Sequence, residues 1–326
     1  MIVGLDVGTN YTKITDGERF LVYPSIVAYG EEREWSLKGA SKNVYVGEEA
    51  LAIIRSVENA EVIRPIHEGR VIHESYVELA KHGIEKLGVR ARHVATGMPV
   101  KSSKREREEV KEKLASSLGC EVLVFPQPAG TMAAMGIETG VCIDVGFGTT
   151  DVLVLSDMEF LRGDTMLLGV DKLYEALETL VRNRSGISLT PEEVTSLLVE
   201  GKKVGRIRSG KRVEVSFDDI AGEYERLVAS WVDRIAGRVK AVLEGLSTLL
   251  LENFVITGGG SMLPKVYELF CEAFSDVGEV KRPEDPIKSN AIGFYEMAKK
   301  LVGETVEESE EDKDEKRSEG KRVRRK

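Results

Sequence analysis

The stretch GLDVGTNYTK, residues 4–13, decides how the whole chain is interpreted, because its pattern is used twice. Residues 142–151 read CIDVGFGTTD, so Asp-Val-Gly-x-x-x-Thr recurs 138 positions later, with Asp144 in the place of Asp6. Each copy follows an apolar run. Each therefore predicts a buried strand that carries a carboxylate to its end, followed by a glycine-rich hairpin whose backbone amides can face an anion. Two such units predict two related lobes that face one polyphosphate.

The composition is that of a globular protein with more than one core. A chain of 326 residues is long enough for two domains. Hydrophobic residues make up 42% of it, and no apolar run approaches the roughly 20 residues of a membrane helix. The first residues, MIVGLD, lack a basic segment and predict a first strand rather than a signal peptide. Cys120, Cys142 and Cys271 show no Cys-x-x-Cys spacing, which favours buried, reduced thiols. We therefore expect a cytoplasmic protein without a transmembrane segment.

The charge of the chain is acidic overall but uneven at its end. Lys and Arg number 46 against 55 Asp and Glu, a net charge of −9, which argues against nonspecific nucleic-acid binding by the body of the protein. Residues 304–326 are almost entirely polar, acidic first and basic last, and are expected to be disordered. The basic end could bind an acidic partner, nucleic acid or anionic lipid. The preferred interpretation is a solubilising tail.

Strands alternate with helices along the chain, which predicts an α/β class with partly parallel sheets. Strands are expected at residues 11–15, 19–22, 93–97, 121–125, 141–144, 152–155, 160–161 and 253–257, and helices at 48–55, 75–87, 101–118, 131–135, 171–183, 191–200, 265–274 and 292–301. Asp16-Gly17 predicts a two-residue turn, and Thr190 predicts a helix N-cap. The helical stretch at 218–251 is expected to break or kink at Gly237 and Gly245.

Both hairpins have the residues that polyphosphate binding requires. Glycine lets backbone amides approach closely, and a carboxylate pair can hold a divalent cation between phosphate oxygens. Asp6 and Asp144 should lie at paired strand ends, where Mg²⁺, held through water, would offset their repulsion. Lys13 could reach a phosphate as a point charge. The candidate phosphate-binding residues are Gly8, Thr9, Asn10, Lys13, Gly146, Phe147, Gly148 and Thr149. Two ordinary hairpins remain the alternative.

Two further features extend the phosphate site into a nucleotide site. The glycines Gly258, Gly259 and Gly260 follow an apolar strand and would let a ring or ribose lie against the backbone, with Met262 as a polarizable cover. The alternative is a flexible turn. Gln127 could orient water, since phosphoryl transfer to water depends mostly on alignment and charge stabilisation. Its alternative role is a capping or hinge residue before Pro128.

Other motif-like features carry less weight. Residues 205–212, GRIRSGKR, nearly match a P-loop, but Arg212 stands where Ser or Thr belongs, and we expect a basic hairpin with a Ser-Gly turn. The four histidines, His67, His73, His82 and His93, lack metal-ligand spacing.

Taken together, these motifs resemble the actin, hexokinase and heat-shock-chaperone ATPase superfamily over the whole chain except the tail. Residues 127–129 and 290–294 resemble its two connecting helices. The resemblance implies two actin-like (ribonuclease H-like) lobes around a central nucleotide cleft, formed by residues 1–131 plus 290–303 and by residues 132–289. It implies ATP or ADP with Mg²⁺ as cofactors and Asp6, Asp144 and Gln127 at the hydrolytic centre. It also suggests Gly169 and Glu223 as nucleoside contacts.

Within the superfamily, residues 46–50, 64–66 with Gly69, and 96–100 resemble prokaryotic actin-like proteins, of the plasmid-segregating ParM type and of archaeal single-chain relatives. This resemblance implies a slow ATPase that forms nucleotide-dependent filaments for a cytoskeletal or DNA-segregation role, with an adaptor protein or DNA–protein complex as a partner. Residues 31–46 and 209–212 depart from the pattern, and outer regions of this kind hold filament contacts. A non-polymerising chaperone-like or regulatory ATPase switch stays open, as does the choice between ATP and GTP. A small-molecule kinase is disfavoured by Gln127 and by the lack of an acceptor base.

Overall fold

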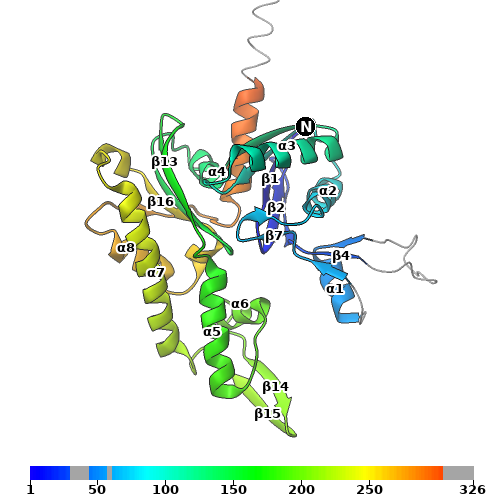
Figure 1. Ribbon diagram of the computed structural model, residues 1–326, viewed down its shortest axis with the longest axis vertical. Coiled ribbons are helices and arrows are strands. Elements are labelled where there is room, and N and C mark those ends of the chain that lie inside the picture. The colour runs from blue at the N-terminus through cyan, green and yellow to red at the C-terminus, as the bar shows by residue number, and fades with distance from the viewer. Residues whose placement is uncertain (30–43, 57–60, 304–326) are drawn as a thin grey trace, which may run out of the picture.

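The computed structural model describes residues 1–29, 44–56 and 61–303, and its centre is a pair of five-stranded sheets with one topology (Figure 1). The first has the order β3-β2-β1-β9-β10 and the second the order β13-β12-β11-β16-β17. In both, the first three strands are antiparallel and the last two run parallel to the central strand. The strands are β1 (Ile2–Val7), β2 (Tyr11–Thr15), β3 (Phe20–Pro24), β9 (His93–Met98), β10 (Glu121–Pro126), β11 (Gly140–Val145), β12 (Thr150–Ser156), β13 (Glu159–Met166), β16 (Phe254–Thr257) and β17 (Val280–Lys281).

The two repeated hairpins have the same register. Asp6 lies opposite Lys13 across β1 and β2, and Asp144 lies opposite Asp151 across β11 and β12. The turns close alike, since the Gly8 amide donates to the Tyr11 carbonyl at 3.2 Å and the Gly146 amide to the Thr149 carbonyl at 2.8 Å. Every one of these positions differs from its counterpart by 138 residues. The predicted duplication of the lobes is therefore confirmed down to single hydrogen bonds.

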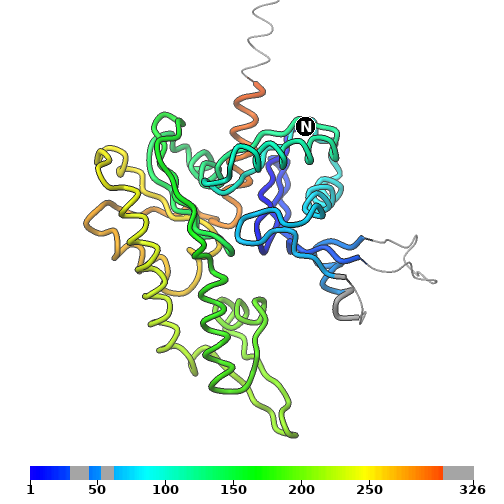
Figure 2. The backbone as a smooth tube through the Cα atoms, viewed as in Figure 1, coloured from blue at the N-terminus to red at the C-terminus, as the bar shows by residue number. Residues whose placement is uncertain are grey.

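Helices cover the first sheet, and a small unit projects from it. The helices are α2 (Tyr76–Leu87), α3 (Lys104–Leu118), α4 (Gln127–Ala134) and a C-terminal helix, residues 289–303, coloured orange in Figure 1. The small unit contains β4 (Val27–Tyr29), β5 (Val44–Val46), β6 (Glu61–Ile63) and α1 (Glu48–Ser56). A separate hairpin, β7 (Ile66–His67) and β8 (Arg70–Val71), lies between this unit and the second lobe (Figure 2).

Long amphipathic helices cover the second sheet. Its elements are α5 (Val170–Ser185), α6 (Pro191–Leu198), α7 (Ala221–Leu243), α8 (Val266–Ala273), the hairpin β14 (Val204–Arg208) and β15 (Lys211–Val215), and the 3₁₀ turns η1 (Thr248–Leu251) and η2 (Gly259–Met262). A continuous apolar core packs α5, α7 and α8 against β11 and β16 through side chains such as Leu177, Tyr224 and Phe270. The hairpin β14–β15 forms the tip of this lobe in Figure 1.

Several local predictions were wrong. Helix α7 passes through Gly237 without a break, since this residue lies on the exposed face and leaves the buried stripe intact. The predicted break at Gly245 is confirmed: the helix ends at Leu243, Gly245 takes a positive φ of 74°, and a separate 3₁₀ turn follows. The first turn centres on Gly17 and Glu18 rather than on Asp16 and Gly17. The Asp16 carboxylate accepts the Glu18 and Arg19 amides and so fixes the turn one residue later.

Two helices begin at other residues than the sequence predicted, and the structure shows why. Helix α3 begins at Lys104 rather than at residue 101, because Ser103 and Glu106 form a capping box. Helix α4 begins at Gln127, earlier than expected, with Pro128 in its first turn. The cap at Thr190 is confirmed, again as a capping box, with Glu193.

Three predictions from composition, on membrane helices, cysteines and the charged tail, can be compared with the structure. None of the helices in the described ranges is long and apolar enough to cross a bilayer. The three cysteines are unpaired, but only Cys142 is buried, and Cys120 and Cys271 are partly exposed. The charged tail, 304–326, lies outside the described residues, as does most of the stretch 31–46.

The C-terminal helix and α4 cross at two glycines between the lobes. A Cβ on Gly293 would overlap the backbone carbonyl of Gly130, and one on Gly130 would lie 2.6 Å from the Asn290 carbonyl oxygen. Phe294 then stacks on Phe125 of β10, with ring centroids 6.3 Å apart. The helices therefore approach closely at a point that no larger residue could occupy.

A buried carboxylate joins the two lobes directly. Asp151 on β12 is 1% exposed, and its Oδ1 accepts the Val100 amide at 2.8 Å from the turn after β9. The hydroxyls of Thr149 and Thr165 also donate to Asp151, and the Lys101 amide donates to Thr165 Oγ1 at 3.0 Å. Burial raises the pKa of Asp151 to about 6, although these hydrogen bonds oppose the shift.

We expect Gly293→Ala to lower the free energy of unfolding by about 1–3 kcal/mol, because the methyl group must push the two helices apart. Gly237→Ala is the matched control: this glycine lies within α7 with no atom near its added Cβ. It should raise stability by about 0.5–1 kcal/mol. Chemical denaturation of both variants measures the difference, and equal effects would contradict the tight crossing.

Asp151→Asn should remove a pH dependence of stability. The carboxyl has a pKa of about 6 in the folded chain against an ordinary value of 3.8, so the folded state binds the proton more tightly. The free energy of unfolding of the wild type should therefore fall as pH rises from about 4 to about 6 and level off above it. Relative to the variant, the loss should be at most about 3 kcal/mol. Denaturation curves at pH 4, 5, 6 and 7 measure it, and parallel trends would refute the assignment.

Candidate nucleotide site between the lobes

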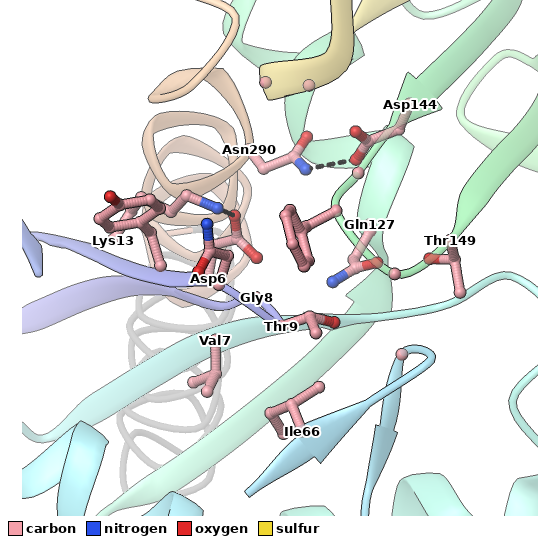
Figure 3. Close-up of a pocket in the computed structure, with 18 of the residues that line it drawn as sticks. Asp6, Val7, Gly8, Thr9, Lys13, Ile66, Gln127, Asp144, Thr149 and Asn290 are labelled. Carbon is pink, nitrogen blue, oxygen red and sulfur yellow. Dashed lines mark hydrogen bonds and ion pairs between the residues drawn. The ribbon is translucent and has the colours of Figure 1, made fainter. Parts of the chain in front are cut away.

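A cavity of about 250 Å³ lies between the two sheets, and the repeated hairpins line it from opposite sides (Figure 3). Its walls form at the carboxyl ends of parallel strands, where ligand sites of open α/β sheets gather. With the exception of Gly169 and Glu223, the residues that the sequence analysis selected for the site line this cavity: Asp6, Gly8, Thr9, Asn10, Lys13, Gln127, Asp144, Gly146, Phe147, Gly148, Thr149, Gly258, Gly259, Gly260 and Met262.

The two repeated carboxylates are buried and have different partners. Asp6, near the end of β1, is 4% exposed and pairs with Lys13, whose Nζ lies 2.9 Å from Oδ2. Asp144, near the end of β11, is 7% exposed, and its Oδ2 accepts Asn290 Nδ2 at 2.7 Å. Burial raises the pKa of Asp144 to about 7. The Asn290 hydrogen bond and the Lys13 charge oppose this shift, and the charges of Asp6 and Asp151 add to it.

The tips of the two hairpins converge. A Cβ on Gly148 would lie 2.8 Å from Thr9 Oγ1 and 3.2 Å from the Glu68 Cα, so a larger residue there would have to displace its neighbours in the first lobe. The turn of β7–β8 closes the same corner. A Cβ on Gly69 would lie 2.7 Å from Pro99 Cγ and 3.0 Å from Thr149 Cγ2. Two backbone turns from the first lobe and one from the second therefore meet where a phosphate chain would lie.

Gln127 is the first residue of α4 and extends its amide into the cavity, toward the space between Thr9 and Thr149 in Figure 3. A Cβ on Gly97 would come within 2.9 Å of Gln127 Cγ, so glycine at residue 97 leaves room for the side chain. Among the described residues, the Gln127 amide has no hydrogen-bond partner. The group is therefore available to a water molecule.

The glycine triplet packs against the second carboxylate. Gly258 has a positive φ of 81°, and a Cβ there would overlap Asp144 Oδ1. Gly260 is buried against Val145 and Val170, whereas Gly259 faces open space. Met262 is 45% exposed at the cavity mouth. The triplet thus brings the backbone close to the site, as glycine permits.

Helices α5 and α6 supply lining residues that the sequence did not single out. Tyr174, Thr195 and Val199 line the cavity, and the Tyr174 hydroxyl lies 3.0 Å from Thr195 Oγ1. Val199, directly after α6, is 53% exposed. The sequence pattern of a helix does not identify such lining residues, because only the fold shows which face of the helix meets the cavity.

Gly169 and Glu223, which the resemblance suggested as nucleoside contacts, are not among the described lining residues. Gly169 packs under the second hairpin, where the first amides of α5 donate to the Gly146 and Phe147 carbonyls at 3.1 and 2.9 Å. Glu223 lies 3.3 Å from Arg184.

Exposed ion pairs also cross the cleft. Arg64 lies 2.9 Å from Glu192 of α6 and 3.3 Å from Asn10 Oδ1. Lys172 of α5 lies 3.6 Å from Glu68. Such exposed pairs each stabilise a structure by at most about 1 kcal/mol.

The donor set of the cavity suits a hydrated cation. Within residues 1–29, 44–56 and 61–303, no three His, Cys, Asp or Glu side chains gather closely enough to enclose a metal ion. The two carboxylates Asp6 and Asp144 face one space instead, as Figure 3 shows. Mg²⁺ commonly uses one or two carboxylates, substrate phosphates and several waters, so these residues fit it.

The P-loop-like segment is a hairpin, as expected. Strands β14 and β15 pair around Ser209 and Gly210, with φ of 49° and 76°, and no phosphate-binding helix follows. His73 lies 2.9 Å from Ser75 Oγ, and His93 lies 3.3 Å from the Glu121 carboxylate on the neighbouring strand.

Comparisons with known proteins place the chain in a family. A sequence model of the family described as MreB/Mbl protein matches residues 1–305. The cell shape-determining protein Mbl of Bacillus subtilis (strain 168) is 27% identical, over 89% of this chain and 93% of that protein. The cell shape-determining protein MreB of Escherichia coli (strain K12) is 26% identical, over 89% and 91%.

Solved structures agree on the fold. MreB5 of Spiroplasma citri bound to AMPPNP superposes with a TM-score of 0.74 at 18% identity, over 94% of this chain and 98% of that one. The MamK double helical filament gives 0.74 at 17%, over 91% and 98%. The archaeal actin homolog Ta0583 gives 0.69 at 22%, over 92% and 99%. The predicted two-lobed actin-like fold is confirmed.

The resemblance to prokaryotic actin-like proteins is likewise confirmed. Because the family model spans all but the charged end of the sequence, the chain belongs to the MreB/Mbl family of actin-like cytoskeletal proteins.

Proposed function

We propose that this protein binds and slowly hydrolyses Mg-ATP between its lobes and assembles in the cytoplasm into nucleotide-dependent filaments. One observation carries the ATP site: two equivalent hairpins from opposite lobes converge at Thr9 and Gly148, with a buried carboxylate at the base of each. We take residues 1–131 plus 290–303 as the first lobe and 132–289 as the second. A nucleotide held by both would link them.

The hairpins would bind the phosphates. The amides of Gly8 and Gly146 close the turns, so the amides of residues 9–10 and 147–149 would face the phosphates, with the Thr9 hydroxyl as a further donor and Lys13 as a positive charge. Asp6 and Asp144 would hold Mg²⁺ through water, and the bound ion would neutralise negative charge between phosphate oxygens. Gln127 would orient the attacking water by a hydrogen bond from its free amide. Alignment of this kind accounts for most of the catalysis of phosphoryl transfer.

The nucleoside would lie against the glycine triplet of the second lobe. The backbone at residues 258–260 gives a flat surface, and Met262 and Val199 are partly exposed apolar side chains that line the same cavity. Burying them under a base would stabilise the complex by the hydrophobic effect.

Assembly is proposed from the family and its relatives. One structural relative is a double helical filament of MamK, and the matched curated relatives are cell shape-determining proteins. ATP that bridges the lobes would favour one lobe arrangement, that arrangement would assemble, and hydrolysis would weaken the contacts. An adaptor protein or a DNA–protein complex is a proposed cargo, and the basic end of the tail could bind an acidic surface.

Gln127→Ala should lower kcat for ATP hydrolysis about 100-fold, because the attacking water loses its orienting group. The affinity for a non-hydrolysable ATP analogue should change less than about threefold, since the residue does not hold the phosphates. A phosphate-release assay and a binding titration measure the two quantities. Equal losses of kcat and affinity would instead make Gln127 a binding residue.

Assembly should depend on the nucleotide. Sedimentation and light scattering at high protein concentration should show polymer with ATP and much less with ADP or without nucleotide. If the wild-type protein stays a monomer in all three states but still hydrolyses ATP, a regulatory switch is favoured over a filament. ADP release stimulated by a sugar or acetate would favour a kinase.

Asp144→Ala should remain folded but hydrolyse no ATP.

A further inference from the structure

A cluster of buried polar side chains lies behind the Asp144 carboxylate, where the helices that connect the lobes cross. Its members come from α4, β16 and the start of the C-terminal helix: Thr131, Thr257, Ser289 and Asn290, all at most 6% exposed. Thr131 Oγ1 lies 2.7 Å from Ser289 Oγ, 2.7 Å from Asn290 Oδ1 and 3.1 Å from Thr257 Oγ1. Buried networks of this kind are favourable only when their members are satisfied.

The orientation of the Asn290 amide follows from this cluster. Its Oδ1 accepts the Thr131 amide at 3.2 Å and the Thr131 hydroxyl at 2.7 Å. The NH₂ group must therefore point the other way, toward Asp144 Oδ2 at 2.7 Å (Figure 3). The Thr131 backbone amide can only donate, so a flipped Asn290 side chain would place its NH₂ group against another donor.

The Asp144 carboxylate is thus held from two sides. Asn290 binds Oδ2, and the Gly258 backbone packs so closely against Oδ1 that no Cβ fits there. Asp6 has no such arrangement: its neighbour is Lys13, a flexible side chain that a phosphate could draw away. Asp6 is therefore paired with a positive charge, whereas Asp144 is held in place by a hydrogen bond and by backbone packing.

We propose that Asn290 is a positioning residue for the cation site: it fixes the rotamer of Asp144 so that the carboxylate presents one geometry to hydrated Mg²⁺ and the phosphates. The assignment rests on the proposed ATPase function. Partners of metal-holding groups that orient them in this way typically contribute 10–100-fold to metal affinity or activity.

The same residue connects the cation site to the crossing of the helices. A Cβ on Gly130 would meet the Asn290 carbonyl oxygen and Cα at 2.6 and 2.8 Å, so the Asn290 backbone is clamped against α4. A rotation of one lobe about this crossing would move the Asn290 amide relative to Asp144. The orientation of the carboxylate and the angle between the lobes are therefore coupled through one side chain.

The test is the Mg²⁺ dependence of ATP turnover, measured beside the Mg²⁺ concentration that half-saturates binding of a fluorescent non-hydrolysable ATP analogue, which should shift in the same direction. In Asn290→Ala, the Mg²⁺ concentration for half-maximal turnover at fixed, saturating ATP should rise about tenfold or more. Asn290→Ser, whose hydroxyl is too short to span the same gap to Asp144, should give a shift in the same direction. It keeps a polar group near Thr131 and guards against a folding defect in the alanine variant. Thermal melts establish that each variant folds.

Ser289→Ala is the matched control, because this serine belongs to the same buried cluster but makes no hydrogen bond to Asp144. It should leave the half-maximal Mg²⁺ concentration within about twofold of the wild type, even if it lowers the melting temperature. An unchanged Mg²⁺ dependence in both Asn290 variants, or an equal shift in Ser289→Ala, would overturn the positioning role. A wild type without Mg²⁺-dependent turnover would overturn the proposed function itself, and this role with it.

Discussion

The structure depends on bringing two carboxylates face to face at the ends of buried strands. Asp6 and Asp144 are nearly inaccessible to solvent, and burial, together with the charges of Asp6 and Asp151, raises the pKa of Asp144 to about 7. A buried charge needs specific partners, and the surroundings supply them: Lys13 beside one carboxylate, Asn290 beside the other. The close glycine turns follow from the same constraint, since they leave space in front of the acids for an anion and its cation. The lobes then serve to hold the two strand ends at a fixed separation.

The most informative difference between the two lobes lies at one duplicated position. Lys13 and Asp151 occupy the same place in the two hairpins, each opposite the repeated aspartate. In the first lobe, the positive charge of Lys13 balances the negative charge of Asp6. In the second, the aspartate turns to the other lobe and accepts the Val100 amide and two threonine hydroxyls. One scaffold thus provides a cation paired with the first carboxylate on one side and an inter-lobe bridge on the other.

Sequence patterns predict this fold well because the decisive signals are local. Strand, carboxylate and glycine turn lie within ten residues in each copy, and capping boxes such as Thr190 with Glu193 can be read directly. Contacts between distant segments are different. Asn290 looks like any polar residue at a helix start, and its bond to Asp144 spans 146 positions. Gly237 looks like a helix breaker until the fold shows that the buried stripe continues on the other side of α7.

The contacts across the cleft also indicate what could control its opening. The pairs Arg64–Glu192 and Lys172–Glu68 are exposed and weak, so they cannot by themselves hold the lobes together. The Asp151 carboxylate also joins the lobes, and it is buried and accepts the Val100 amide together with two threonine hydroxyls. A polyphosphate that contacts both hairpin tips would add a further link across the cleft. A rotation about the crossing of α4 and the C-terminal helix would then reach the Asp144 carboxylate through Asn290, which contacts both.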